Sequence, residues 1–175
     1  TDVGPVIDAD ALKILDDHAA RMDREAKPIK SVTLGAGTEH GTFFAPRAYE
    51  LKELAQLTRE VFGPVLHVIR YDASDLDGVI RAINATGYGL TLGIHSRIDE
   101  TIHKIATGIK VGNCYVNRNQ IGAVVGVQPF GGEGLSGTGP KAGGPHYLPR
   151  FTTERTLTIN TTAAGGNASL LTLDE

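Results

Sequence analysis

Glycines are concentrated in one stretch of the chain, residues 122–144, which we call the glycine loop. Nine of the 22 glycines of the sequence lie in these 23 residues. Ordering a glycine costs more backbone entropy than ordering any other residue, so this density predicts positive φ angles or a close approach of the backbone to a ligand. A disordered linker is the alternative, but linkers lack an apolar run such as 123–125 and a Pro129-Phe130 step. Since successive glycine amides can converge on an anion, we expect an ordered loop that handles a small molecule.

Two nucleotide-binding motifs are nearly matched within the glycine loop, but neither is complete. Residues 132–137 fit G-x-G-x-x-G, yet the sequence TGPKAGGP that follows cannot open the helix that receives a pyrophosphate. Residues 134–141 approach a P-loop, but Pro140 precedes the lysine and Ala142 stands where Ser or Thr would hold magnesium. Neither motif therefore predicts a phosphate site.

Few side chains could act as nucleophiles or metal ligands. Cys114 is the only cysteine and lies in an apolar run, where a thiol is usually a small buried hydrophobic group. A single cysteine excludes an internal disulfide framework and suits a reducing compartment, so we expect a cytoplasmic protein. The six histidines show no H-E-x-x-H or other metal spacing, and we expect no metal site.

Length and composition are those of one ordinary domain or a piece of a larger one, with 175 residues of which 41% are hydrophobic. The net charge of -3 gives no sign of nucleic-acid binding, and no apolar stretch approaches the ~20 residues needed to span a bilayer. Residues 1–5 contain neither an initiator methionine nor a signal peptide, so we expect a fragment of a longer polypeptide.

Apolar residues at helical spacing predict three helices that position the loop. The first covers residues 9–25 with Asp8 as its N-cap; the second is opened by Ser74 in the manner of a capping box and ends before Gly87. Ser96 can cap the third. Their inward faces comprise Leu12, Leu15, Ala19 and Met22; Leu76, Val79, Ile80 and Ile83; and Ile98, Ile102, Ile105 and Ile109.

Runs rich in β-formers predict the strands between these helices, and Pro46 demotes one of them to an edge or bulge. The strand-helix-strand-helix-strand order predicts an α/β fold, mostly a parallel sheet with flanking helices, in which ligands bind beyond the carboxyl ends of strands. The glycine loop leaves such an end after Asn117. Outside this series, 152–162 alternates as a period-2 strand. The predicted strands of the α/β series are 30–34, 43–51, 65–71, 90–95 and 111–117.

Three short motifs carry a resemblance to a known family. Residues 59–64 read REVFGP, 128–132 read QPFGG and 135–137 read LSG. The first motif is separated from the other two by roughly 65 residues. In residue types, order and spacing, the three resemble the E-x-F-G-P and P-F-G-G-x-x-x-S-G elements of the aldehyde dehydrogenase superfamily. The run 137–147 is similar to the pyrroline-5-carboxylate (glutamate semialdehyde) dehydrogenase branch, and 158–167 resembles the end of that module in the proline utilization A family of bifunctional bacterial enzymes.

The resemblance implies the C-terminal part of a dehydrogenase catalytic domain. Residues 1–151 would be a partial catalytic domain, with the nucleophilic cysteine loop, the general-base glutamate and the Rossmann domain all upstream of this chain. Residues 152–175 would be the strand and tail through which such enzymes form homo-oligomers. The resemblance implies NAD as cofactor, with FAD only if a proline dehydrogenase domain precedes this module, and a cytoplasmic, bacterial-type enzyme that is at most peripheral to the inner membrane.

The same resemblance assigns cofactor contacts in residues 59–64. Glu60 resembles the family's ribose-binding glutamate, and a carboxylate with two acceptor oxygens suits two vicinal hydroxyls. Phe62 would then pack beside the nicotinamide ring. The alternatives are a solvated surface charge for Glu60 and a plain core aromatic for Phe62.

Substrate contacts are implied at the end of the glycine loop. Gly143 and Gly144 resemble the residues that anchor the substrate's α-carboxylate through backbone amides, against the alternative of an ordinary turn. Phe151 would be the aromatic that contacts the aliphatic part of the substrate. We expect Ser136 and Lys141 to fix the loop. Arg118 remains open between a charged rim residue and a core ion pair.

Three classes of function stay open on these residues: a catalytic-domain fragment of an NAD-dependent glutamate semialdehyde dehydrogenase, a non-catalytic binding or assembly module that uses the 152–162 strand, and a stand-alone phosphate- or nucleotide-binding α/β protein. Another aldehyde specificity within the same family is a variant of the first. The first class predicts that the chain by itself has no dehydrogenase activity.

Overall fold

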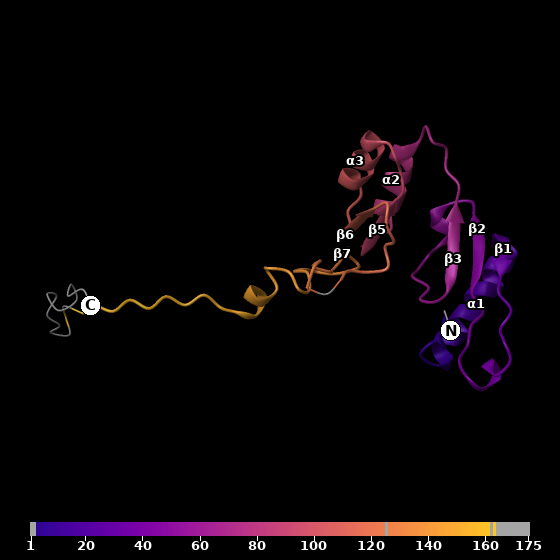
Figure 1. Ribbon diagram of the computed structural model, residues 1–175, viewed down its shortest axis with the longest axis horizontal. Coiled ribbons are helices and arrows are strands. Elements are labelled where there is room, and N and C mark those ends of the chain that lie inside the picture. Colours follow the sequence, from indigo (N-terminus) through magenta and orange to yellow (C-terminus); the bar gives the residue numbers. More distant parts are fainter. Residues whose placement is uncertain (1–2, 125, 162, 164–175) are drawn as a thin grey trace.

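The structure is a computed structural model that describes residues 3–124, 126–161 and 163 (Figure 1). A helix and a three-stranded sheet form the N-terminal half, and two helices with short strands form a second group. The chain then runs through the glycine loop into an extended C-terminal segment. Together these parts confirm a mixed α/β architecture.

The N-terminal half is built on helix α1, Ala9–Glu25, whose limits agree with the prediction. The Asp8 carboxylate accepts a hydrogen bond from the Ala11 amide at 2.7 Å, which confirms Asp8 as the N-cap. The predicted apolar face is buried, because Leu15, Ala19 and Met22 are at most 3% exposed. The helix therefore forms where local periodicity and a cap agree.

Strands β1 (Lys27–Ser31), β2 (Arg47–Leu51) and β3 (Val65–Ile69) form one sheet against α1. β1 is antiparallel to β2, whereas β2 and β3 run parallel from the Arg47–Val65 pair onward. The predicted strand over 43–51 is the central strand β2 and not the expected edge, and it begins after Pro46, which has no amide hydrogen for the ladder. The predicted 30–34 strand forms three residues earlier.

The second group contains the βαβ unit that the sequence predicts. β5 and β6 pair in parallel, and helix α3 connects them. Gly87, at a φ of 75°, follows the end of α2, as expected. The elements are α2 (Leu76–Ala85), β4 (Tyr88–Gly89), β5 (Thr91–Ile94), α3 (Asp99–Gly108), β6 (Asn113–Val116) and β7 (Glu133–Gly134).

Both predicted caps of these helices are wrong by one or two residues. Ser74 does not cap α2, because its amide and hydroxyl both bond to the Asp72 carboxylate. Asp75 caps α2 instead and accepts from the Gly78 amide at 2.9 Å. At α3 the N-cap position is Ile98, which is 59% exposed rather than inward, and Ser96 accepts from its amide.

The expectation of one mostly parallel sheet is only partly confirmed. The strands form three separate sheets, β1-β2-β3, β5-β6 and the antiparallel pair β4-β7. Within the described residues, β3 and β5 have no common neighbour, so each group keeps an unpaired strand edge. Sequence order predicts parallel pairs but not which pairs share one sheet.

The predicted strand over 152–162 is not formed within the described chain. A short 3-10 helix, η3 (Leu148–Phe151), precedes it, and residues 152–160 extend from it without secondary structure (Figure 1). No described strand lies beside this segment to pair with it. Residue 162 and residues 164–167, part of the run that resembles proline utilization A, lie outside the described residues.

Candidate cofactor and substrate site

The segment 60–64 leads directly into β3 and is held by the N-terminal core. Val61 packs against the buried cluster of Leu15, Ala19 and Phe44. Gly63 lies so close to α1 that a Cβ there would stand 2.5 Å from the Leu15 Cδ2 atom. The glycine of E-x-F-G-P therefore allows a close approach, and the core fixes the backbone beside Glu60.

Glu60 is exposed and lines a cleft of about 740 Å³. No hydrogen bond or ion pair with another described residue occupies its carboxylate. His67 of β3, Leu92 of β5 and Ser136 of the glycine loop line the same cleft. The volume is that of an ordinary small-molecule site, and Glu60 supplies two free acceptor oxygens there.

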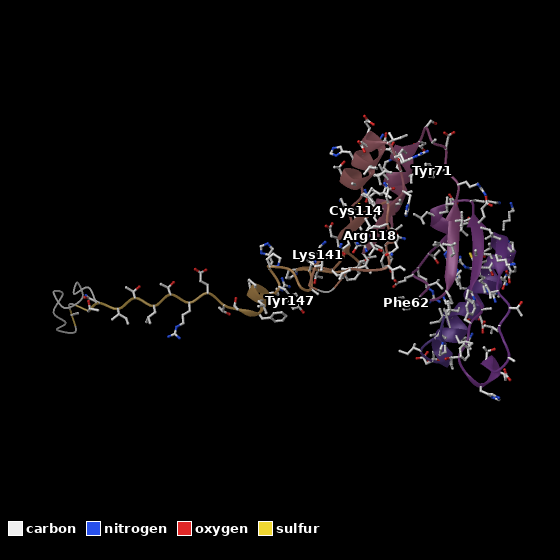
Figure 2. The ribbon with its side chains drawn as sticks, viewed as in Figure 1. Phe62, Tyr71, Cys114, Arg118, Lys141 and Tyr147 are labelled. Atoms are coloured by element: carbon white, nitrogen blue, oxygen red, sulfur yellow. The ribbon has the colours of Figure 1, made fainter. Side chains whose placement is uncertain are left out.

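Phe62 does not line this cleft, and its side chain is 86% exposed. The alternative of a plain core aromatic is therefore wrong. Because Val61 turns into the core, its neighbours Glu60 and Phe62 are left exposed. In Figure 2, Phe62 stands clear of the N-terminal sheet. An exposed aromatic of this kind is available for a partner ring.

The described residues of the glycine loop are held by hydrogen bonds within the loop and to the second group, which fits the expectation of an ordered loop. Phe130 and Ala142 exchange two backbone hydrogen bonds, each of 3.0 Å, and so close the loop at its base. The Ser136 hydroxyl accepts from the Gly89 amide at 3.0 Å, which confirms that Ser136 fixes the loop. No α-helix follows Gly137 among the described residues, in line with the rejection of a dinucleotide fingerprint.

Lys141 also fixes the loop, through a partner that the sequence analysis missed. Its ammonium donates to the Gly112 carbonyl and, at 3.4 Å, to the side-chain oxygen of Asn113. Asn113 is 8% exposed at the start of β6 and also binds Pro129 and Gly131. The signal available in the sequence was an amide side chain at the start of an apolar strand, directly after a glycine.

A turn over residues 141–144 follows this anchor. Gly143 has a φ of 72°, which residues other than glycine rarely adopt, and the Gly144 amide donates to the Lys141 carbonyl at 3.0 Å. The expected pair of free adjacent amides is therefore only half present. Only the Gly143 amide lacks a backbone partner among the described residues, because the Gly144 amide closes the turn.

Phe151 ends the short helix η3 and is 73% exposed. Its ring meets that of Tyr147 edge-on, with centroids 5.4 Å apart. Tyr147 lies beside η3 in Figure 2. Phe151 follows the turn along the chain, but neither it nor Gly143 nor Gly144 lines the cleft that contains Glu60. Within this chain the two candidate cofactor residues and the three candidate substrate residues therefore lie on separate elements.

Two further candidates are resolved by the structure. Cys114 is exposed rather than buried, because burial alternates along β6 and its neighbours Asn113 and Tyr115 face inward. Partial desolvation raises the pKa of the Cys114 thiol, which opposes a nucleophilic role. Arg118 makes no ion pair among the described residues; its guanidinium stacks on the Tyr115 ring, 4.5 Å from the centroid, and bonds to Gln128.

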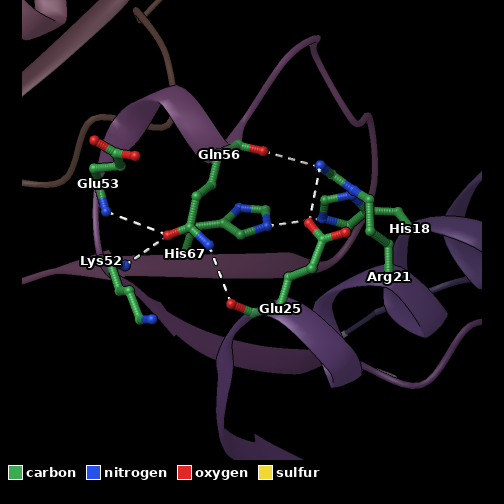
Figure 3. Close-up of polar contacts among 7 residues, drawn as sticks. All are labelled: His18, Arg21, Glu25, Lys52, Glu53, Gln56 and His67. Carbon is green, nitrogen blue, oxygen red and sulfur yellow. Dashed lines mark hydrogen bonds and ion pairs between the residues drawn. The ribbon is translucent and has the colours of Figure 1, made fainter.

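Another polar contact that the sequence analysis missed joins α1 to β3 (Figure 3). The Nε2 atoms of His18 and His67 lie 2.9 Å apart, so one imidazole donates to the other. Desolvation is the main cause that lowers the pKa of both rings, and the nearby Arg21 guanidinium lowers it further. His18 shares the helix face of Leu15 and Met22, which was the signal for its burial.

Neither a membrane-spanning helix nor a cluster of metal ligands occurs in the described part of the chain. Across residues 3–124, 126–161 and 163, no helix is long and apolar enough to cross a bilayer. The same residues contain no group of three or more His, Cys, Asp or Glu side chains that could hold a metal ion.

Comparison with known proteins gives the same family as the motifs. A model of the aldehyde dehydrogenase family matches residues 1–157. The bifunctional protein PutA of Rhizobium meliloti is 57% identical over 152 residues, which cover 87% of this chain and 12% of that protein. The chain therefore spans about an eighth of the length of this relative.

Solved structures agree in fold. A mutant of proline utilization A from Bradyrhizobium japonicum matches with a TM-score of 0.86 and 62% identity, covering 92% of this chain and 16% of that one. A 1-pyrroline-5-carboxylate dehydrogenase from Thermus with bound NAD matches with a TM-score of 0.75 and 37% identity, covering 86% of this chain and 29% of that one. With a family match over most of its length, the chain belongs to the aldehyde dehydrogenase family.

Proposed function

We propose that the chain is part of an NAD-dependent dehydrogenase that oxidises L-glutamate γ-semialdehyde to glutamate in proline catabolism. The observation that carries the proposal is the placement of Glu60: a carboxylate without a partner among the described residues lines a cleft that the anchored glycine loop also lines. The names of the similar proteins, PutA and 1-pyrroline-5-carboxylate dehydrogenase, support the same reaction.

The residues of segment 60–64 fit NAD. Glu60 can accept hydrogen bonds from both hydroxyls of the nicotinamide ribose, and the exposed Phe62 ring can cover the nicotinamide. When bound, NAD would take the hydride released by the aldehyde. The protein would hold the ribose in a fixed position, because the packing of Val61 and Gly63 on α1 makes this segment rigid. FAD enters the proposal only if a proline dehydrogenase domain precedes this segment.

The turn over residues 141–144 would anchor the carboxylate of the aldehyde. The Gly143 amide is available to donate, and the Gly144 amide would be shared between the Lys141 carbonyl and the ligand. Phe151 would contact the aliphatic carbons. Such a site would favour short aldehydes that carry a carboxylate over uncharged ones of the same length.

Catalysis requires the rest of the polypeptide, on this proposal. The nucleophilic cysteine and the general base would come from upstream, so the 175-residue chain should give no reduced cofactor when it is mixed with NAD and glutamate semialdehyde. Activity that Cys114→Ala abolished would overturn this. The exposed segment 152–160 supports an assembly role, in which copies of the polypeptide pair through this segment as a strand. On this proposal the enzyme is cytoplasmic and bacterial.

The test of the proposed function is Glu60→Ala in the full-length polypeptide. Removing one partner of a charged hydrogen bond costs about 1.5–3 kcal/mol, which corresponds to roughly tenfold to a hundredfold weaker NAD binding. Calorimetry of NAD binding and the KM for NAD measure it. Glu100→Ala, which removes an exposed carboxylate on α3, is the matched control and should leave both unchanged. Unchanged NAD affinity in Glu60→Ala would mean that Glu60 is a surface charge.

A further inference from the structure

We propose that Asn113 and Lys141 are positioning residues that set the orientation of the turn at Gly143 and Gly144, and thereby the preference for aldehydes that carry a carboxylate. This inference rests on the proposed substrate site. Neither residue is expected to touch the substrate. Both would act through the backbone of the turn.

Asn113 is the centre of the contact between β6 and the glycine loop. Its Nδ2 atom donates to the Pro129 carbonyl at 3.0 Å and to the Tyr115 hydroxyl at 3.3 Å. Its Oδ1 atom accepts from the Gly131 amide at 3.2 Å and from the Lys141 ammonium at 3.4 Å. A buried amide thus has two acceptors for its nitrogen and two donors for its oxygen. This pattern leaves only one orientation of the amide, because a flip would set donors against donors.

Lys141 links this centre to the turn within one residue. Its ammonium is bound to the Gly112 carbonyl and to Asn113 at the start of β6. Its own carbonyl accepts from Gly144. A shift of the side chain therefore moves the first residue of the turn that would hold the carboxylate. Figure 2 shows Lys141 in the glycine loop, near the end of the second group of elements.

Close packing also restricts the position of the glycine loop beside β6. A Cβ at Gly112 would overlap the Gly131 carbonyl, and one at Gly131 would stand 3.3 Å from the Lys141 Cα atom. The limb with Gly131 is therefore pressed onto the residue before β6, and the limb with Lys141 is pressed onto the first limb. Without the ammonium, the Gly112 carbonyl and the Asn113 oxygen would lose a donor in a partly buried place, and the limb would move to regain water. The turn would then be ordered only upon binding, which weakens binding.

Lys141→Met in the full-length enzyme tests the proposal, because it keeps the length of the side chain and removes the ammonium. We expect the KM for glutamate semialdehyde and the inhibition constant of its product glutamate to rise roughly tenfold, while kcat/KM for propanal changes less than about twofold. Lys141→Arg, which keeps the charge, should recover part of the loss. Lys30→Met, on an exposed lysine of β1, is the matched control.

The outcomes separate this inference from the proposed function. Equal losses for the semialdehyde and propanal would assign Lys141 a general structural role and overturn the inference, as would unchanged kinetics. A wild-type enzyme that does not oxidise glutamate semialdehyde with NAD would overturn the proposed function itself. If Lys141→Met fails to fold, Asn113→Asp carries the test: it keeps the acceptor for Lys141, removes the donor to Pro129 and should show the same selective loss.

Discussion

The two regions that would form the site are held in place by different forces. The segment with Glu60 and Phe62 rests on an apolar core of Leu15, Ala19 and Phe44, which are at most 4% exposed. The glycine loop has few buried apolar side chains and is held by hydrogen bonds to β4 and β6. An apolar core is destabilised when the volume of a side chain changes, whereas a polar network is disrupted when one hydrogen-bond partner is removed. The cofactor side and the substrate side should therefore respond to different mutations.

The largest effect is expected from Leu15→Ala in the N-terminal core. Replacing a fully buried leucine leaves a cavity and costs about 3–5 kcal/mol of unfolding free energy. Urea denaturation of the 175-residue chain, followed by helical circular dichroism, measures it. Because Gly63 contacts Leu15, NAD affinity of the full-length enzyme should fall more than its discrimination between charged and uncharged aldehydes.

Ile14→Ala is the control for this prediction. Ile14 is the neighbour of Leu15 on α1 and is 40% exposed, so its loss should cost less than about 1 kcal/mol. Similar losses in the two variants would show that Leu15 is not at the centre of a core, and the contrast between the two regions would disappear.

A smaller and more selective effect is expected from Gly144→Val. A Cβ there would lie 3.1 Å from the Lys141 carbonyl oxygen and 3.3 Å from the Pro129 Cβ atom, so the turn must shift by a few tenths of an ångström. We expect the KM for glutamate semialdehyde to rise roughly tenfold, equal to about 1.4 kcal/mol, with propanal far less affected. Phe151→Ala should weaken the binding of both aldehydes, because it removes only an apolar contact. If Gly144→Val weakens both equally, the turn does not anchor a carboxylate.

The smallest effect is a pH dependence in the N-terminal half. Folding lowers the pKa of His18 and His67 through desolvation, with Arg21 beside both rings and Arg59 near His18. As the pH falls below the ordinary histidine pKa of about 6.5, the unfolded chain therefore binds more protons than the folded chain. The contribution of the pair to the unfolding free energy is complete above that pH and is lost as the pH falls. Unfolding free energies at several pH values should decline less in His67→Gln than in the wild type. Parallel profiles would show that the pair does not titrate with folding.

Prediction from sequence was best where structure is local. Helix α1 and its Asp8 cap follow from residues within a few positions of one another, and both are confirmed. Sheet assembly was predicted less well, because the strand that lies beside β3 or β5 depends on distant parts of the chain. Period-2 spacing in 152–162 could not show whether a partner strand exists within these residues.

The candidate site divides in the same way. The exposure of Glu60 and Phe62 fits their motif, whereas the central role of Asn113 was missed because burial of an amide depends on a loop that returns 16 residues later. An ordinary turn was the alternative for Gly143 and Gly144, but the sequence could not show that the Gly144 amide closes one, since only three-dimensional structure shows which carbonyl accepts it. The roles of these residues in binding remain predictions.

The alternating burial of β6 has a consequence for insertions and deletions. Asn113 and Tyr115 face the loop while Cys114 and Val116 face outward, and pairing with β5 fixes this parity. One residue inserted within β6, before Asn113 in the ladder with β5, would exchange the two faces and set a thiol where the loop needs an amide. Residues added between 119 and 124, which are mostly exposed, would alter only the length of a connection. Related chains should therefore differ in length after β6 and keep a constant length within it.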